Sequence, residues 1–223
     1  MRRALLVALL LLAGCGGQEV SSAPGTAPRA TPSSSPSCPT LVLAFRGQGQ
    51  STHGFHGAGR EAGQVAERLG SRVVGVRFPS GADASTYGSD VAAGVRMADR
   101  LVRTACGRVV VVGYSQGAEV AHRVVVAHPR RVTLAVLMGD PLRDPADRVN
   151  TLTLGTGSLA GRGNGGPYAR FPAAVRSRVL EVCVRGDDVC NAPLTGRVGP
   201  PSATHRTAYQ GEGAVRHIVG AAS

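Results

Sequence analysis

One stretch near the middle of the chain limits its fold more than any other, namely residues 109–121, which read VVVVGYSQGAEVA. Four consecutive valines are typical of a strand buried on both faces, and the run from Ala118 to Ala121 favours a helix that begins directly afterwards. Between them, Ser115 is flanked by Gly113 and Gly117. A connection this sharp needs both glycines because a side chain there would collide with the strand or the helix. The stretch predicts a parallel α/β sheet that presents a serine hydroxyl at its tip.

A serine in this position is a candidate nucleophile. The first turn of the following helix leaves the backbone N–H of Gln116 available to bind a developing negative charge. A serine in an ordinary surface turn is the simpler alternative, but the strand before Ser115 and the helix after it favour catalysis. We therefore expect Ser115 to be nucleophilic.

The rest of the folded chain alternates between apolar runs and stretches with helical spacing. The expected strands are residues 41–46, 72–78, 109–112, 132–139 and 178–183, and the expected helices are 60–69, 87–105, 116–128 and 211–222. This alternation predicts a three-layer α/β/α sandwich around a five-stranded parallel sheet. Residues 140–174 lack periodicity and indicate a surface loop, and no separate lid domain is apparent.

The first 15 residues are typical of an export signal. Two arginines precede an apolar run from Ala4 to Ala13, which is too short to span a bilayer as a helix. The run ends in Leu-Ala-Gly-Cys at residues 12–15, which resembles a bacterial lipoprotein box and implies cleavage before Cys15 and lipidation of Cys15. Acyl chains would anchor the protein at the outer face of the cell membrane. The alternative is an ordinary secretory signal, after whose cleavage the protein is secreted.

Residues 16–37 are mostly Ser, Pro, Ala, Thr and Gly, which predicts a disordered tether, and residues 38–223 suit one domain with a sizeable core. The net charge is +11, and every basic residue other than histidine is arginine. The arginines are scattered and no nucleic-acid motif accompanies them, so we expect no nucleic-acid partner. A basic surface favours an anionic envelope, and a simple compositional bias explains the charge equally well. We expect a monomer.

Four cysteines remain once Cys15 is lipidated, and an even number in an exported chain predicts two disulfides. Three pairings are possible. Cys183 and Cys190 are close in sequence, while Cys38 and Cys106 each precede a predicted strand, which would place them at the same edge of a parallel sheet. The pairing of Cys38 with Cys106 and of Cys183 with Cys190 is therefore the most economical.

A serine nucleophile needs a base that takes its proton. Among the histidines after Ser115, His122 and His128 lie on the predicted helix that leaves the turn, and His217 lies inside the last predicted helix. His205 lies in a polar loop just before that helix, from which a side chain can reach over the sheet. We expect His205 to be the base.

Two carboxylates compete to be the acid that orients this base. Asp187 follows the fifth predicted strand inside the short loop between Cys183 and Cys190, where a disulfide would fix the direction of its side chain. Asp140 follows the fourth predicted strand, where some hydrolases place their acid. We expect Asp187 to be the acid, with Asp140 as the alternative.

Three spaced motifs together with both cysteine pairs resemble the cutinase family of serine esterases, in its actinobacterial branch. Residues 113–118 (GYSQGA) match the nucleophile motif, and residues 183–190 match the acid-bearing loop closed by a disulfide. Residues 45–47 (FRG) resemble the segment that supplies the oxyanion hole, and residues 139–141 (GDP) resemble a further family signature. The similarity spans residues 38–220.

The resemblance implies a serine carboxylesterase that acts on acyl esters or lipids and has a cutinase-like α/β-hydrolase fold. It implies that Ser115 forms an acyl intermediate while His205 moves the proton and Asp187 orients His205. The backbone amides of Gln48 and Gln116 would bind the oxyanion. No cofactor is implied. We also expect no metal site, because the pair His53 and His56 would supply only half of the ligands and has no evident partner ligands.

The chain departs from the family pattern at two positions. Gln48 stands where the family usually has Ser or Thr, and Tyr209 follows His205 one residue later than usual. Within the family, an acetyl-xylan or trehalose-ester hydrolase is the alternative activity. Outside catalysis, a silent cutinase-like binding protein is the rival, and Gln48 is the feature that favours it.

Overall fold

A computed structural model describes residues 38–156, 159–193 and 200–223. The predicted signal at residues 1–15, the lipidation at Cys15 and the predicted tether at residues 16–37 lie outside the described residues. Within the described part of the chain, no helix has both the length and the apolar composition needed to cross a bilayer.

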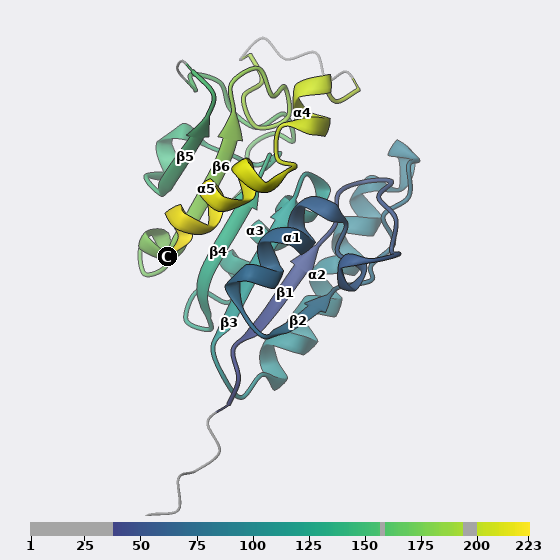
Figure 1. Cartoon of the computed structure of the whole chain (residues 1–223), viewed down its shortest axis with the longest axis vertical. Coiled ribbons are helices and arrows are strands. Elements are labelled where there is room, and N and C mark those ends of the chain that lie inside the picture. Colours follow the sequence, from purple (N-terminus) through teal and green to yellow (C-terminus); the bar gives the residue numbers. More distant parts are fainter. Residues whose placement is uncertain (1–37, 157–158, 194–199) are drawn as a thin grey trace, which may run out of the picture. The chain divides into compact units, whose positions relative to one another are not determined.

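The described strands are β1 Leu41–Phe45, β2 Arg72–Gly75, β3 Val109–Tyr114, β4 Val132–Met138, β5 Asn150–Leu154 and β6 Val179–Val184. They form one parallel sheet in the order β2-β1-β3-β4-β6-β5 (Figure 1). The predicted count of five was one too low, because β5 lies inside the segment interpreted as a loop. This edge strand is exposed or half-buried along its whole length, so it lacks the apolar run that marks the central strands.

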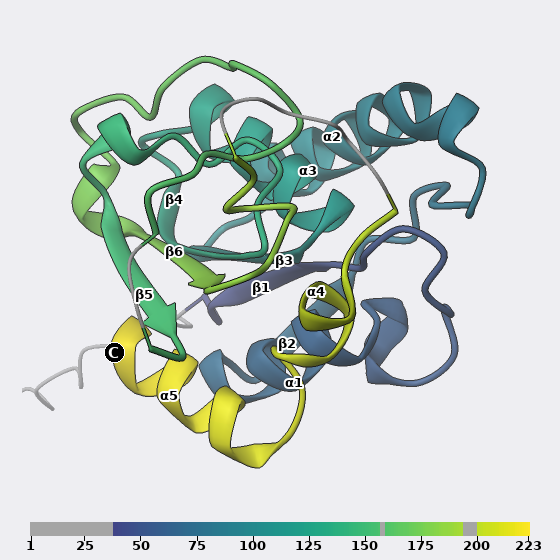
Figure 2. The same ribbon diagram turned by 90° about the horizontal axis from the view of Figure 1, so that it is seen from above.

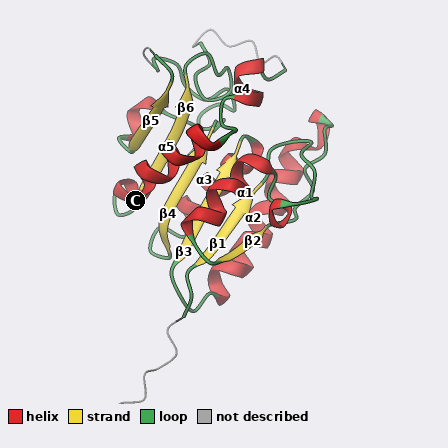
Figure 3. Ribbon diagram, in the orientation of Figure 1, coloured by secondary structure: helices red, strands yellow, loops and turns green. Residues whose placement is uncertain are grey.

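Helices cover both faces of the sheet, as the view from above shows (Figures 2 and 3). Helices α1 (Arg60–Leu69) and α5 (Glu212–Ala222) lie on one face, and α2 (Tyr87–Thr104) and α3 (Gln116–Ala127) lie on the other. These four helices begin and end within one residue of the predicted positions. The predicted three-layer α/β/α sandwich is confirmed. Short elements complete the described chain, namely α4 (Ala203–Thr207) and four single turns of 3-10 helix at Phe55–Gly57, Ala84–Thr86, Pro145–Asp147 and Arg176–Arg178.

The central strands serve two separate hydrophobic cores. Leu43 and Phe45 of β1 point toward α2 and α3, whereas Val42 and Ala44 point toward α1 and α5. The valines of β3 alternate in the same way, so that both sides of the strand are buried. This explains why the stretch at residues 109–112 is uniformly apolar rather than alternating with polar residues.

Both predicted disulfides are present. Cys38 and Cys106 precede β1 and β3, and their Cα atoms lie 5.7 Å apart at the amino edge of the sheet. Cys183 and Cys190, with Cα atoms 6.0 Å apart, close the loop that follows β6 at the opposite, carboxyl edge. The second disulfide therefore lies at the same edge as the turn that carries Ser115.

Candidate active site

The turn between β3 and α3 holds Ser115 in a strained backbone conformation, with φ 55° and ψ −122°. The glycines on either side are required by contact. A Cβ atom at Gly113 would collide with the carbonyl of Gly117, and a Cβ atom at Gly117 would collide with the carbonyls of Phe45 and Arg46. Because α3 lies this close to β1 and β3, the serine is displayed at the carboxyl edge of the sheet.

Asp187 and His205 are brought together from segments 18 residues apart. The Nδ1 atom of His205 lies 2.9 and 3.0 Å from the two carboxylate oxygens of Asp187, and both side chains are at most 2% exposed. The backbone N–H of Val189 donates to Asp187 Oδ1 at 2.8 Å, and the hydroxyl of Tyr209 donates to Oδ2. Burial opposes ionisation, but the hydrogen bonds from His205 and Tyr209 and the charge of His205 outweigh it, so the pKa of Asp187 lies below its usual range.

The segment that carries His205 differs from the prediction, because it is the short helix α4 rather than a loop. Ser202 caps this helix by accepting a hydrogen bond from the backbone N–H of His205 at 3.1 Å. From β3, the hydroxyl of Tyr114 donates to the carbonyl of His205 at 2.8 Å, and the two rings stack with centroids 5.1 Å apart. The position and the orientation of the imidazole are therefore both constrained.

The Asp187 bond also decides which nitrogen of His205 carries a proton. A carboxylate accepts from Nδ1–H, so Nε2 is left as the basic nitrogen. Within the part of the chain that the structure describes, Nε2 is buried and has no hydrogen-bond partner. A buried acceptor without a partner is uncommon, and here it belongs to the side chain expected to accept a proton.

Ser115 and His205 line a common hollow of about 370 Å³ at the carboxyl edge of the sheet. Gln48 lies on its wall, directly after the Phe-Arg-Gly segment that ends β1. Across residues 38–156, 159–193 and 200–223, neither the backbone N–H of Gln48 nor that of Gln116 donates to another protein group. The described lining consists of Gln48, Gly49, Gln50, Glu61, Ala82, Tyr114, Ser115, Pro201, His205, Arg206 and Gln210.

Asp140, the alternative acid, has a different partner. Its Oδ2 lies 2.7 Å from Nδ1 of His122, and both side chains are at most 2% exposed. Burial favours the neutral ring of His122, but the charge of Asp140 and the hydrogen bond with it raise the pKa of His122. The structure thus separates Asp140 from His205 and gives it a buried partner on α3.

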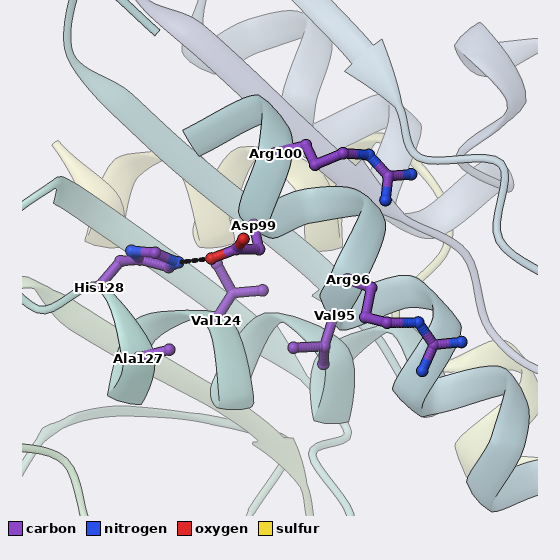
Figure 4. Close-up of a pocket in the computed structure, with 7 residues that line it drawn as sticks. All are labelled: Val95, Arg96, Asp99, Arg100, Val124, Ala127 and His128. Atoms are coloured by element: carbon purple, nitrogen blue, oxygen red, sulfur yellow. Dashed lines mark hydrogen bonds and ion pairs between the residues drawn. The ribbon is translucent and has the colours of Figure 1, made fainter. Parts of the chain in front are cut away.

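A second hollow of about 380 Å³ lies between α2 and α3 (Figure 4). His128 Nε2 and Asp99 Oδ1 are 2.8 Å apart on its wall, so this histidine also has a carboxylate partner. None of the described residues that line it is a serine, threonine or cysteine. Of the two hollows, the one at Ser115 is therefore the candidate active site. His217 is exposed on α5.

The described residues contain no group of three or more His, Cys, Asp or Glu side chains arranged to hold a metal ion. One of the two histidines considered as half of a metal site is His56. Its Nε2 atom lies 3.4 Å from Oε1 of Glu67.

One side chain in the hollow was missed by the sequence analysis. Glu61 lies in the first turn of α1 and is 2% exposed, although a glutamate at a helix N-terminus is usually solvated. Its carboxylate accepts hydrogen bonds from the side chains of Gln50 and Gln210. A signal was present in the spacing, because Glu61 is four residues before Val65 and so lies on the apolar stripe of α1.

The whole described domain also matches a known family. Residues 37–219 match the sequence profile of the family Cutinase. The chain belongs to the cutinase family. It is therefore a carboxylic ester hydrolase, as its motifs predicted. No curated protein matches the chain significantly.

Several solved structures share the fold of this cutinase-family chain. The catalytic core domain of acetyl xylan esterase from Trichoderma reesei has a TM-score of 0.62 and 19% identity, over 83% of this chain and 98% of that chain. A cutinase-like protein from Cryptococcus sp. has a TM-score of 0.62 and 19% identity, over 85% and 96%. Trichoderma reesei cutinase in complex with a phosphonate inhibitor has a TM-score of 0.51 and 24% identity, over 84% and 74%. These likenesses support the fold.

Proposed function

We propose that the protein is a serine esterase that works through an acyl-enzyme on Ser115, with His205 as the base and Asp187 as the orienting acid. The observation that carries this proposal is the buried Nε2 of His205, which has no hydrogen-bond partner among the described residues and belongs to a side chain that lines the same hollow as the strained Ser115. Asp187 accepts from the opposite nitrogen and so fixes the productive tautomer.

In the first half of the reaction, the Ser115 hydroxyl oxygen attacks the ester carbonyl while its proton passes to His205 Nε2. The backbone N–H groups of Gln48 and Gln116 donate to the oxyanion that forms. When the tetrahedral intermediate collapses, the C–O bond to the alcohol breaks and the alcohol leaves with the proton from His205.

In the second half, water attacks the acyl-serine and gives its proton to His205 Nε2. Collapse of the second tetrahedral intermediate breaks the bond between the acyl carbon and the Ser115 oxygen, and His205 returns the proton to that oxygen. The carboxylic acid leaves, and no metal or redox cofactor takes part in these steps.

The side chain of Gln48 has an open role in this scheme. In the described part of the chain it makes no hydrogen bond, and it is half-buried on the wall of the hollow. We propose that its amide is available to donate to the oxyanion in the place of the serine or threonine hydroxyl usual in the family. If it does, Gln48→Ala should lower kcat on the order of tenfold or more.

The lining of the hollow favours short acyl groups and polar alcohols. None of its described residues is Val, Leu, Ile, Met or Phe, so a long alkyl chain would find few aliphatic partners there. Side chains that can hydrogen-bond to sugar hydroxyls are present in Gln48, Gln50 and Gln210. A carbohydrate esterase of the acetyl-xylan type is therefore the second candidate, and one of the structural relatives has that activity in its name.

Hydrolysis of p-nitrophenyl esters from acetate to palmitate tests the proposal, with acetylated xylan as a polymeric substrate. We expect turnover to disappear in Ser115→Ala and to persist in the control Ser71→Ala, since Ser71 is exposed and remote from the hollow. A maximum at acetate, with release of acetate from the polymer, supports the carbohydrate esterase. A folded protein that hydrolyses no ester and is not labelled by a phosphonate would instead be a silent binding protein.

We also propose that the protein is exported and held at the outer face of the cell membrane by lipidated Cys15. The sequence of residues 1–15 supports this, as do two disulfides, which are typical of oxidising compartments. Cys15→Ser should release the protein from the membrane fraction. Membrane attachment that persists in this variant would contradict the lipid anchor.

A further inference from the structure

The buried carboxylate of Glu61 is the strongest feature that the proposed mechanism leaves unused. It lies on the wall of the Ser115 hollow and is 2% exposed. Both of its oxygens are held by neutral amides, Oε2 by Gln50 Nε2 and Oε1 by Gln210 Nε2, the latter at 2.7 Å. Within residues 38–156, 159–193 and 200–223, no basic side chain forms an ion pair with it. Burying a charge without a counter-charge costs stability, which points to a role in the site.

The hydrogen bond from Gln50 connects Glu61 to the oxyanion segment, by which we mean residues 47–48 with the proposed oxyanion donor Gln48. Gln50 uses its other side-chain atom, Oε1, to accept from the backbone N–H of Gly47 at 2.8 Å. Gly47 is directly followed by Gln48, whose amide is one of the two proposed oxyanion donors. The approach of Gln50 depends on Gly59, because a Cβ atom there would collide with the Gln50 side-chain amide. Through Gln50, the carboxylate of Glu61 fixes the segment that carries Gln48.

The hydrogen bond from Gln210 connects Glu61 to the segment of the proposed base. Gln210 Nε2 donates to Glu61 and, at 2.7 Å, to the carbonyl of Arg206. Arg206 directly follows His205 in α4. Gln210 also directly follows Tyr209, whose hydroxyl donates to Asp187. Glu61 and Gln210 are 149 residues apart in sequence, so this contact joins two segments that are far apart in the chain.

We infer that Glu61 is a positioning residue, which holds the oxyanion segment and the His205 segment at a fixed separation across Ser115. The inference rests on the proposed esterase function and adds to it a residue that acts through Gln50 and Gln210 rather than on the substrate. We call the three side chains Gln50, Glu61 and Gln210 the amide–carboxylate clamp. Displacements of about 1 Å at a reacting centre can cost on the order of 100-fold in rate, so a clamp of this kind affects kcat.

With glutamine at positions 50 and 210, the hydrogen bonds of the clamp require a carboxylate at position 61. Glu61 faces two N–H donors, and each of them donates to a different oxygen of its carboxylate. In Glu61→Gln, the introduced amide has one acceptor and must turn its NH₂ group toward another NH₂ group. Gln50 cannot rotate to relieve this without losing Gly47, and Gln210 cannot rotate without losing the carbonyl of Arg206.

The chain offers a rescue that keeps every hydrogen bond. In the double variant Gln50→Glu with Glu61→Gln, the carboxylate moves to position 50, where one oxygen still accepts from Gly47 and the other accepts from the new amide at position 61. The carbonyl of that amide then accepts from Gln210. The exchange conserves the composition, the net charge and the number of hydrogen bonds of the wild type. The single variant Glu61→Gln loses one negative charge as well as the donor–acceptor matching, and the control Glu67→Gln loses the same charge outside the clamp.

The test is steady-state kinetics on p-nitrophenyl acetate, together with the rate of labelling of Ser115 by a phosphonate and the melting temperature of each variant. In Glu61→Gln we expect kcat to fall on the order of 10- to 100-fold, with KM changed by less than about threefold. The double variant should return kcat to within about threefold of the wild type, and labelling should follow kcat. The matched control is Glu67→Gln, in the same helix, whose side chain is 44% exposed and outside the clamp.

A wild-type kcat in folded Glu61→Gln would overturn the inference, and so would a folded double variant that fails to recover. If Glu61→Gln does not fold, Gln210→Leu removes the hydrogen bond from Gln210 alone and should lower kcat in the same way, and unchanged kcat in that variant would overturn the inference. Failure of the esterase proposal is distinct, because the wild type itself would then neither hydrolyse esters nor be labelled.

Discussion

Replacing Tyr209 by phenylalanine should destabilise the domain by removing one hydroxyl behind the Asp187–His205 pair. The side chain is fully buried, and its hydroxyl donates to Asp187 Oδ2 and accepts from the backbone N–H of Val184 at 3.3 Å. A hydrogen bond to a charged group contributes about 1.5–3 kcal/mol. At about 2–4 °C per kcal/mol for a domain of this size, Tyr209→Phe should lower the melting temperature by about 3–12 °C.

The loss of stability in Tyr209→Phe should depend on pH, because the hydroxyl of Tyr209 favours the ionised form of Asp187. Burial acts in the opposite direction, yet the pKa of Asp187 is lowered, and the Tyr209 hydroxyl is one of the causes. A carboxylate with a depressed folded pKa stabilises the protein above its unfolded pKa, and this stabilisation is lost as pH falls through the folded pKa. We therefore expect the difference in stability between wild type and Tyr209→Phe to be largest near neutral pH and to become smaller below about pH 4.

Thermal unfolding followed by circular dichroism, from about pH 3 to about pH 8, measures this difference. The matched control is Tyr168→Phe, which removes a hydroxyl from a tyrosine that is 39% exposed. Its stability should stay within about 0.5 kcal/mol of the wild type. A difference of constant size over the whole pH range would refute the reasoning, because the hydroxyl would then act independently of the charge on Asp187.

Three further changes test other parts of the structure by thermal or urea unfolding. The free energy of unfolding of Glu181→Gln should rise relative to that of the wild type as pH rises above 4.5. Burial raises the pKa of Glu181 well above that value, so the folded wild type keeps a proton that the unfolded chain releases. Parallel profiles of unfolding free energy against pH would contradict this. Gly117→Ala should lower the free energy of unfolding by more than about 2 kcal/mol, because its methyl group would meet carbonyls at the end of β1. Gly88→Ala, whose methyl group would meet no atom within 4 Å, should be neutral or stabilising. Equal effects of the two substitutions would count against the argument. Replacing both Cys183 and Cys190 by serine should cost about 2–3 kcal/mol for opening a short loop, and an unchanged midpoint would show that the disulfide adds nothing.

The parts of the fold that could be predicted are those in which one local pattern decides the outcome. The buried valine strand, the glycine-flanked Ser115 and the spacing of the four main helices each depend on neighbours in sequence. β5 could not be found in this way, because its Thr and Leu residues lie half-exposed at the edge of the sheet. It becomes a strand by pairing with β6, which is a tertiary contact.

The same distinction applies to the candidate site. Asp187 could be proposed because it follows a predicted strand and His205 because it precedes a predicted helix, and the structure does bring them together. Whether Asp140 or Asp187 meets His205 could not be read from spacing, since both follow strands that end at the same edge of the sheet. The helical spacing indicated that Glu61 lies on the apolar side of α1, but its partner Gln210 is far away in sequence and could not be found in this way.

The parallel sheet also gives the domain a fixed polarity. The described chain enters at Cys38, which is bonded to Cys106 at the amino edge, whereas Ser115 and its hollow lie at the carboxyl edge. Five residues of β1, at about 3.3 Å each, separate the two ends. A fusion partner or a solid support joined directly to Cys38 would therefore meet the domain at the edge of the sheet opposite to Ser115.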